Sequence, residues 1–141
     1  MKRRLLTFVI ACSSACIAVT TLQAQSFVTA GDIPFAFHVG KTTLPAGHYK
    51  FSQLMPDKFQ VIRSLENGRS VMVVANPDEA TGAPQSRVTF HRYGEQYFLS
   101  EMQSANGSDV RVPVTAAEQE AREHAAPNQE ASVSIGLLAQ R

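Results

Sequence analysis

The sequence has no tryptophan, and its two cysteines, Cys12 and Cys16, both lie near the N-terminus. The rest of the chain cannot form a disulfide, so its stability must come from a packed core. After residue 19 there is no apolar run of the roughly 20 residues that a membrane-spanning helix needs. Acidic and basic residues nearly balance, so we expect neither nucleic-acid binding nor recruitment to an anionic membrane.

The N-terminus has the three-part order of a secretory signal peptide. Basic residues at 2–4 precede an apolar segment at 5–19, and Leu22-Gln23-Ala24 offers a cleavage site. We expect cleavage after Ala24, so that residues 25–141 form a single secreted or periplasmic β-rich domain. Loss of three basic residues leaves ten basic against twelve acidic ones, a net charge of about −2.

Two alternatives for this segment are a membrane anchor and a lipoprotein signal. The apolar segment is shorter than a bilayer core requires, which disfavours an anchor. Val9-Ile10-Ala11-Cys12 resembles a lipobox, whose cysteine would be lipidated and held at the membrane. Because apolar sequence continues past Cys12, we favour an ordinary, cleaved signal peptide.

The clearest structural signal is the stretch Arg87–Ser104, which predicts a β-hairpin. Gly94 and Glu95 are the two central turn residues, and Gly94 supplies the positive φ that a type II′ turn needs first. This turn predicts three cross-strand pairs: Arg92 with Tyr97, Phe90 with Leu99, and Val88 with Glu101. Arg92 over Tyr97 would add a cation–π contact.

In this register Val88, Phe90 and Leu99 form the core face, and Thr89, His91, Phe98 and Ser100 the opposite face. Glu101 falls on the core face, where a buried carboxylate needs a cationic partner. The candidates for that partner are Arg63, Arg87 and Arg92.

Alternating apolar residues and turn signals predict further strands. They lie at 33–39, 48–54, 59–65, 69–75 and 133–138, with a short extended piece at 110–113. We expect a loose leading segment at 26–32, turns at 40–43 and 44–47, a break at 55–57 and a loop at 76–86. Asn67-Gly68 predicts a type I′ hairpin turn. Val71 to Val74 is apolar on both faces, which predicts that its outer side is covered.

One helix is predicted late in the chain. Thr115-Ala116-Ala117-Glu118 is a capping box, in which Thr115 accepts from the third helical N–H and Glu118 reaches back. The helix should end near Ala125, before Pro127, and pack its alanines (Ala116, Ala117, Ala121 and Ala125) on the sheet.

About seven strands in hairpin order with one late α-helix predict a mainly β fold, a small antiparallel barrel. A two-sheet β-sandwich is the alternative. Five aromatic residues at alternating positions would fill the interior and leave no lipocalin-like cavity: Phe35, Phe37, Tyr49, Phe51 and Phe90.

Two segments, IPFAFHVGKTTLPAGHYKF and FHRYGEQYFLSE, resemble a family of small exported proteins of soil bacteria. That family carries a PFxFxVG–LPAGxY opening and an FHRYGxxYFL hairpin, and the resemblance runs from about Ile33 to Glu120. It implies a β-barrel-like exported domain and carries no assigned activity. Many relatives have a tryptophan shortly after the hairpin glutamate, where this chain has Gln103.

The motifs of common enzymes are missing from the sequence. His38, His48 and His91 lack metal-site spacing, although convergence with Glu101 would allow one, so we expect no metal or other cofactor. No serine lies in a G-x-S-x-G elbow. The carboxylates Asp32, Asp57 and Glu95 fall at turns, where solvated charges are common, so we predict no catalytic residues.

We therefore expect an exported non-catalytic protein, either structural or a binding module for a small molecule or protein partner. The alternative is a hydrolase-like enzyme of the envelope or extracellular space. The candidate ligand-binding residues are Arg92, Tyr93 and Tyr97, because they combine a charge with two rings beside the Gly94 turn.

Overall fold

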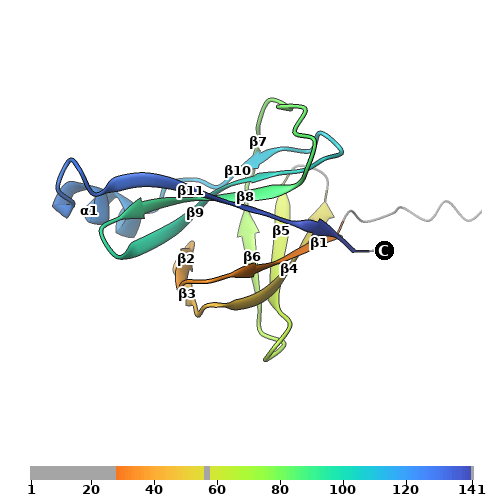
Figure 1. The fold of residues 1–141 in the computed structure, drawn as a ribbon, viewed down its shortest axis with the longest axis horizontal. Helices are drawn as coiled ribbons and strands as arrows, with labels where there is room; N and C mark the ends of the chain where they lie inside the picture. Colours follow the sequence, from red (N-terminus) through yellow and green to blue (C-terminus); the bar gives the residue numbers. More distant parts are fainter. Residues whose placement is uncertain (1–27, 56–57, 141) are drawn as a thin grey trace, which may run out of the picture.

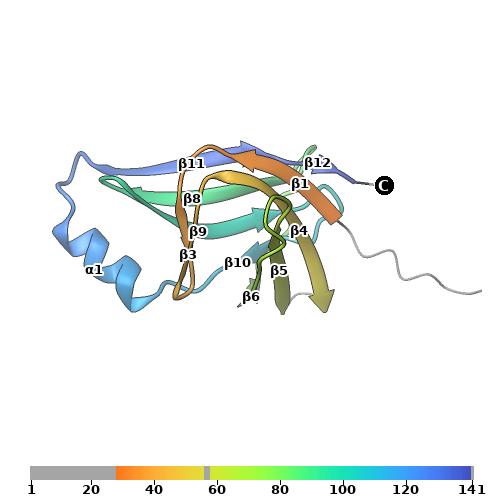
Figure 2. The same cartoon turned by 90° about the horizontal axis from the view of Figure 1, so that it is seen from below.

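The computed structural model describes residues 28–55 and 58–140, and it is a mainly β fold with one α-helix in those ranges. Two curled sheets form a half-barrel (Figures 1 and 2). The predicted barrel-like class is confirmed. The predicted signal peptide, the lipobox and residues 56 and 57 of the predicted break lie outside the described residues.

The first sheet has five strands in the order β12-β1-β4-β5-β6. Their bounds are β1 Val28–Ile33, β4 Gly47–Met55, β5 Phe59–Ser64, β6 Ser70–Val74 and β12 Leu138–Ala139. Every pair in this sheet is antiparallel.

The second sheet has the order β11-β8-β9-β10-β7, with a small hairpin, β2–β3, attached to β9. Its bounds are β2 Phe37–Val39, β3 Thr42–Leu44, β7 Asn76–Pro77, β8 Arg87–Tyr93, β9 Gln96–Gln103, β10 Val110–Arg111 and β11 Glu130–Gly136. One contact in this sheet is parallel, between β2 and β9 at His38 and Phe98.

The chain passes from one sheet to the other at buried corners. Ala75 separates β6, in the first sheet, from β7, in the second, and Leu137 separates β11 from β12 in the same way. Leu137 is held at its corner by its backbone N–H, which donates to the Ser86 carbonyl at 2.7 Å. Strands that switch sheets in this way join the two layers at their sides, which favours the barrel over the sandwich.

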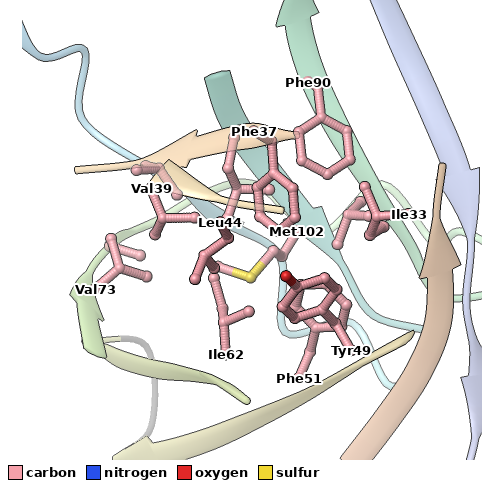
Figure 3. Close-up of a cluster of buried hydrophobic side chains, with 14 of the residues drawn as sticks. Ile33, Phe37, Val39, Leu44, Tyr49, Phe51, Ile62, Val73, Phe90 and Met102 are labelled. Atoms are coloured by element: carbon pink, nitrogen blue, oxygen red, sulfur yellow. The ribbon is translucent and has the colours of Figure 1, made fainter. Parts of the chain in front are cut away.

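The space between the sheets is filled by side chains from both of them, as Figure 3 shows. Phe37 lies edge-on to Tyr49 of the first sheet and to Phe90 of the second, with ring centroids 5.1 and 5.2 Å apart. Four of the five aromatic residues predicted to fill the interior are buried, and the fifth, Phe35, packs against the core half-buried.

The central hairpin forms with the predicted turn end. Arg92 pairs with Tyr97 and Phe90 with Leu99, and Gly94 has φ of 61°. The guanidinium of Arg92 lies 5.7 Å from the centroid of the Tyr97 ring, as the cation–π expectation requires.

Beyond Leu99 the predicted register is wrong, because Ser100 is an extra residue on β9. Thr89 pairs with Glu101 and Val88 with Met102, a one-residue shift. The Ser100 hydroxyl donates to the Thr89 carbonyl at 3.0 Å, which stabilises this β-bulge. Met102 therefore enters the core, whereas Glu101 leaves the core face and needs no buried cation.

The predicted strand at 33–39 is two strands, because the chain bends at 34–36 and changes sheets there. The segment at 26–32 was expected to be loose, yet residues 28–33 form β1, paired with β4 on one side and β12 on the other. The expected turn at 40–43 contains only two residues, since Val39 already pairs with Thr42.

The hairpin between β5 and β6 has a longer loop than the two residues predicted. The last strand pair is Arg63 with Ser70, and the Gly68 N–H donates to the Ser64 carbonyl across the loop. Gly68 has φ of 71°, as expected of its position. Asn67 instead accepts from the Arg69 N–H through its side chain, which closes an Asx turn.

The expected cover over β6 is absent among the described residues. Met72 is 58% exposed and Val74 57% exposed, both on the outer face. The sequence pattern predicted burial on both faces, but only the inner side chains contact the core: Val73 is part of it, and Val71 packs against it half-buried.

Asp109 anchors the long loop between β7 and β8. Its carboxylate accepts from the Thr81 N–H at 2.8 Å, the Thr81 hydroxyl at 2.7 Å and the Ser104 N–H at 2.9 Å. Burial by itself would raise the pKa of Asp109, but these hydrogen bonds and the charge of Arg87 outweigh it, so the pKa lies below its ordinary value.

We predict that Phe90→Ala lowers the free energy of unfolding by about 3–5 kcal/mol, because Phe90 is fully buried between the sheets. Thr89→Ala, on the opposite face of the same strand, should cost much less. Urea denaturation of both variants measures the difference. Equal losses would contradict the assignment of faces.

A second prediction concerns pH. Because the pKa of Asp109 is lowered by folding, its contribution is complete above the unfolded-state pKa and is lost as pH falls through the folded-state pKa. Asp109→Asn should lower the free energy of unfolding at neutral pH by about 2–3 kcal/mol. It should also reduce the acid dependence of that free energy.

Denaturant unfolding at neutral and acidic pH tests this, with Glu79→Gln, an exposed change in the same loop, as control. An acid dependence of stability that is the same in Asp109→Asn and in the wild type would argue against this role.

Candidate functional site

The helix α1, Ala116–His124, lies at the end of the molecule that carries the β8–β9 turn (Figures 1 and 2). The Thr115 hydroxyl accepts from the Glu118 N–H at 3.2 Å, so the predicted N-cap is confirmed. The helix ends at His124, and the N–H of the next residue, Ala125, donates to the Ala121 carbonyl, which agrees with the end predicted before Pro127.

The helix is attached to the sheet through a carboxylate. Glu118 is its one buried residue, and its Oε1 lies 2.8 Å from Nδ1 of His91 on the outer face of β8. The predicted return of Glu118 to Thr115, the second half of the capping box, is therefore wrong. A buried carboxylate gains more from a ring N–H on the sheet than from a backbone N–H in water.

Tyr93 completes this attachment. It is 6% exposed, and its hydroxyl interacts with Glu118. Burial, followed by the charges of Glu118 and Glu130, raises the pKa of Tyr93 above its ordinary value. Tyr93 thus lies buried under the helix, close to the Glu118 carboxylate.

The predicted alanine contact with the sheet is wrong. Ala116 and Ala117 are exposed, and Ala121 and Ala125 are half-buried. Ala117, Ala121 and Ala125 instead line a groove with Glu120 and His124, positions that recur on one face of a helix.

This opening, called here the α1 groove, has a volume of about 480 Å³ and lies between α1 and the β8–β9 turn. The turn side contributes Tyr93, Gly94, Glu95 and Gln96, and the segment after the helix contributes Gln129. Most polar lining groups are carboxylates, amides and an imidazole, which can exchange hydrogen bonds with a polar ligand.

The structure brings two of the three predicted site residues together. Arg92 and Tyr97 share the inner face, where the Tyr97 ring also stacks on Phe35 at a centroid distance of 3.8 Å. Arg92 is held by its own turn, since its Nε donates to the Gly94 carbonyl at 2.7 Å. Tyr93 points to the opposite face, toward α1.

The groove side chains contributed by α1 were missed by sequence reasoning. The signal was present in the spacing of Ala117, Glu120, Ala121 and His124, which form one helical stripe. From the sequence, only the alanines of the helix are expected to pack on the sheet, because a helix this short is marginal alone. Only the position of Glu118 shows that the stripe faces outward.

Each of the three strand histidines has a different partner. His38 bonds the Thr43 hydroxyl and stacks on Phe98, His48 pairs with Asp32 at 2.6 Å, and His91 pairs with Glu118. Within residues 28–55 and 58–140, no three His, Cys, Asp or Glu side chains are grouped closely enough to hold a metal ion.

The interior offers little room. A pocket of about 40 Å³ lies between the sheets at the end away from α1, lined among others by Thr29, Gln60 and Ser104. It has space for a few water molecules. Ser104 Oγ is the one buried side-chain polar atom of the described residues without a hydrogen-bond partner, and water in this pocket would satisfy it.

Comparison with protein-family models, curated proteins and solved structures found no match to this chain. The resemblance to exported soil-bacterial proteins therefore stays a prediction.

We predict that Glu118→Ala loosens α1, because it removes the one buried contact of the helix and leaves His91 unpaired. The expected loss of stability is about 1–3 kcal/mol. Hydrogen exchange of the α1 amides should accelerate more than that of β8. Glu123→Ala, an exposed change on the same helix, is the control, and equal acceleration in both variants would contradict the prediction.

Proposed function

We propose that this chain is an exported, non-catalytic binding module that contacts its ligand at the α1 groove. The observation that carries the proposal is the contrast between a filled interior and an open groove. The interior pocket measures about 40 Å³, whereas the groove measures about 480 Å³. Ligand pockets of proteins usually fall in the range of about 300–1,000 Å³.

The way the helix is attached supports this proposal. An α1 packed by apolar side chains would lie flat on the sheet and leave no groove. A single buried carboxylate, bound to His91 and close to Tyr93, holds the helix at Glu118, while the stripe from Ala117 to Ala125 lines the opening. The groove therefore follows directly from this polar attachment.

The absence of catalytic spacing supports a binding role over a hydrolase. The acid–imidazole pair of Glu118 and His91 is occupied in holding the helix. His91 Nδ1 is bound to the carboxylate, and the His91 ring lies 6.2 Å from that of Tyr93. A catalytic use would need a nucleophile beside this histidine.

Export to the periplasm or the medium is part of the proposal and rests on the predicted signal peptide. Among residues 28–55 and 58–140, no helix combines the length and the hydrophobicity that crossing a membrane requires.

The test is a ligand screen by thermal shift on the exported protein, whose start at Gln25 is checked by N-terminal sequencing. A ligand at 100 times its dissociation constant should stabilise the protein by about 2.7 kcal/mol. Ala117→Trp should abolish this stabilisation, because it narrows the groove. Ala116→Trp, also exposed on α1 and outside the groove lining, should keep it.

Arg92→Ala and Tyr97→Ala test the inner side of the same turn. Stabilisation that is lost in these variants and kept in Ala117→Trp would move the site from the groove to that side. Robust turnover of a substrate would overturn the non-catalytic assignment.

A further inference from the structure

The strand β6 is an unprotected sheet edge. It lies at the end of the first sheet, and no described strand pairs with its second edge (Figure 1). Natural edge strands are usually blocked by charges, proline or a bulge. β6 reads Ser-Val-Met-Val-Val, and its ladder with β5 runs without a register shift.

The hydrogen bonds that flank β6 show which backbone groups point outward. The Ser64 N–H donates to the Arg69 carbonyl at 2.8 Å, and the Ala75 N–H donates to the Lys58 carbonyl at 2.9 Å. Along an antiparallel ladder, hydrogen-bonded pairs alternate with pairs that are not hydrogen-bonded. Both flanking pairs are hydrogen-bonded, so every second residue of β6 counted from either of them bonds to β5. The N–H and C=O groups of the residues in between, Ser70, Met72 and Val74, therefore point away from β5.

The outer face beside this edge is apolar. Met72 is 58% exposed and Val74 57% exposed, and their cross-strand neighbours on β5 are Val61 and Phe59, both half-buried. Leu54 of β4, 59% exposed, extends the patch. An exposed patch of this kind beside an open edge usually marks an interaction surface.

We infer that β6 pairs with β6 of a second copy of this chain, antiparallel about a two-fold axis at Met72. Met72 then faces Met72 of the partner copy, and Ser70 faces the partner copy's Val74. All six outward N–H and C=O groups find partners in this arrangement. On the inner side Val71 meets Val73, which extends the core across the junction.

The identity of the occupant follows from self-complementarity. Val71 meets Val73 on the inner face and Met72 meets Met72 at the centre of the outer face, so the middle of the pair is apolar, and β6 carries no charge that would repel its copy. The nearest basic residue on the outer face of β5, Arg63, lies beside Ser70, so the two copies of Arg63 fall at opposite ends of the junction. An isologous contact also closes on itself and gives a dimer rather than a fibre.

This inference is independent of the α1 groove, which lies on the second sheet. Light scattering of the exported protein across the micromolar range should give a dimer. Met72→Lys places two like charges opposite each other and should give a monomer. Val114→Lys changes a side chain of similar exposure, 56%, outside the strands and should remain dimeric.

Cross-linking tests the register. Directly opposed residues of a hydrogen-bonded pair have Cα atoms about 5.5 Å apart, within the disulfide range. If cleavage follows Ala24, the exported chain has no cysteine of its own, so an introduced cysteine can pair only with its copy. Met72→Cys should therefore form a covalent dimer under oxidation, whereas Val114→Cys should not. Both variants should keep the wild-type circular dichroism spectrum.

Three results would overturn the inference: a monomeric wild type, a dimer that survives Met72→Lys, or equal cross-linking of the two cysteine variants.

Discussion

The contact of Phe37 with both sheets is the interaction on which the fold depends. Its ring lies edge-on to Tyr49 on one side and to Phe90 on the other, and it is fully buried. To place Phe37 there, the chain must leave the first sheet after Ile33 and cross to β9. The chain makes this crossing at the bend at 34–36. Pro34 suits the bend because proline has no backbone N–H that would be left without a strand partner there.

The β-bulge at Ser100 has a comparable effect on the hairpin. It turns Met102 into the core and moves Glu101 to the face of Thr89. At this level the interior is then closed by apolar side chains, with Met102 opposite the buried Val88, and it needs no buried ion pair. Burying a carboxylate there would have required a cation as well, at a desolvation cost that a small domain cannot easily offset.

On its outer face the same hairpin is covered by polar groups, in contrast to the apolar contacts on its inner face. There the sheet is covered by a polar contact, with Glu118 placed between His91 and Tyr93. Because one carboxylate holds the helix, α1 leaves a groove beside the turn. The proposed binding role depends on this geometry, and the open edge of β6 lies apart from it on the other sheet. The molecule thus offers two different surfaces around one filled core.

The sequence alone determined the turns, caps and helix end that depend on one or two neighbouring residues. The Gly94 turn, the pairing of Phe90 with Leu99, the Thr115 cap and the helix end before Pro127 were all predictable. Each depends on the conformational limits of one or two residues, and the alternation of aromatic residues is enough to predict a β-rich, barrel-like fold.

Tertiary structure decided the features that depend on distant partners. The bulge at Ser100, the corners at Ala75 and Leu137 and the exposure of Met72 have no signal in their own residues. The partner of Glu118 could not be found either, because His91 is 27 residues away. The candidate site was therefore predictable only at the turn, where Tyr93 and Gly94 lie. Its helical side required the packed structure, since the same stripe of residues could have faced the sheet or the solvent.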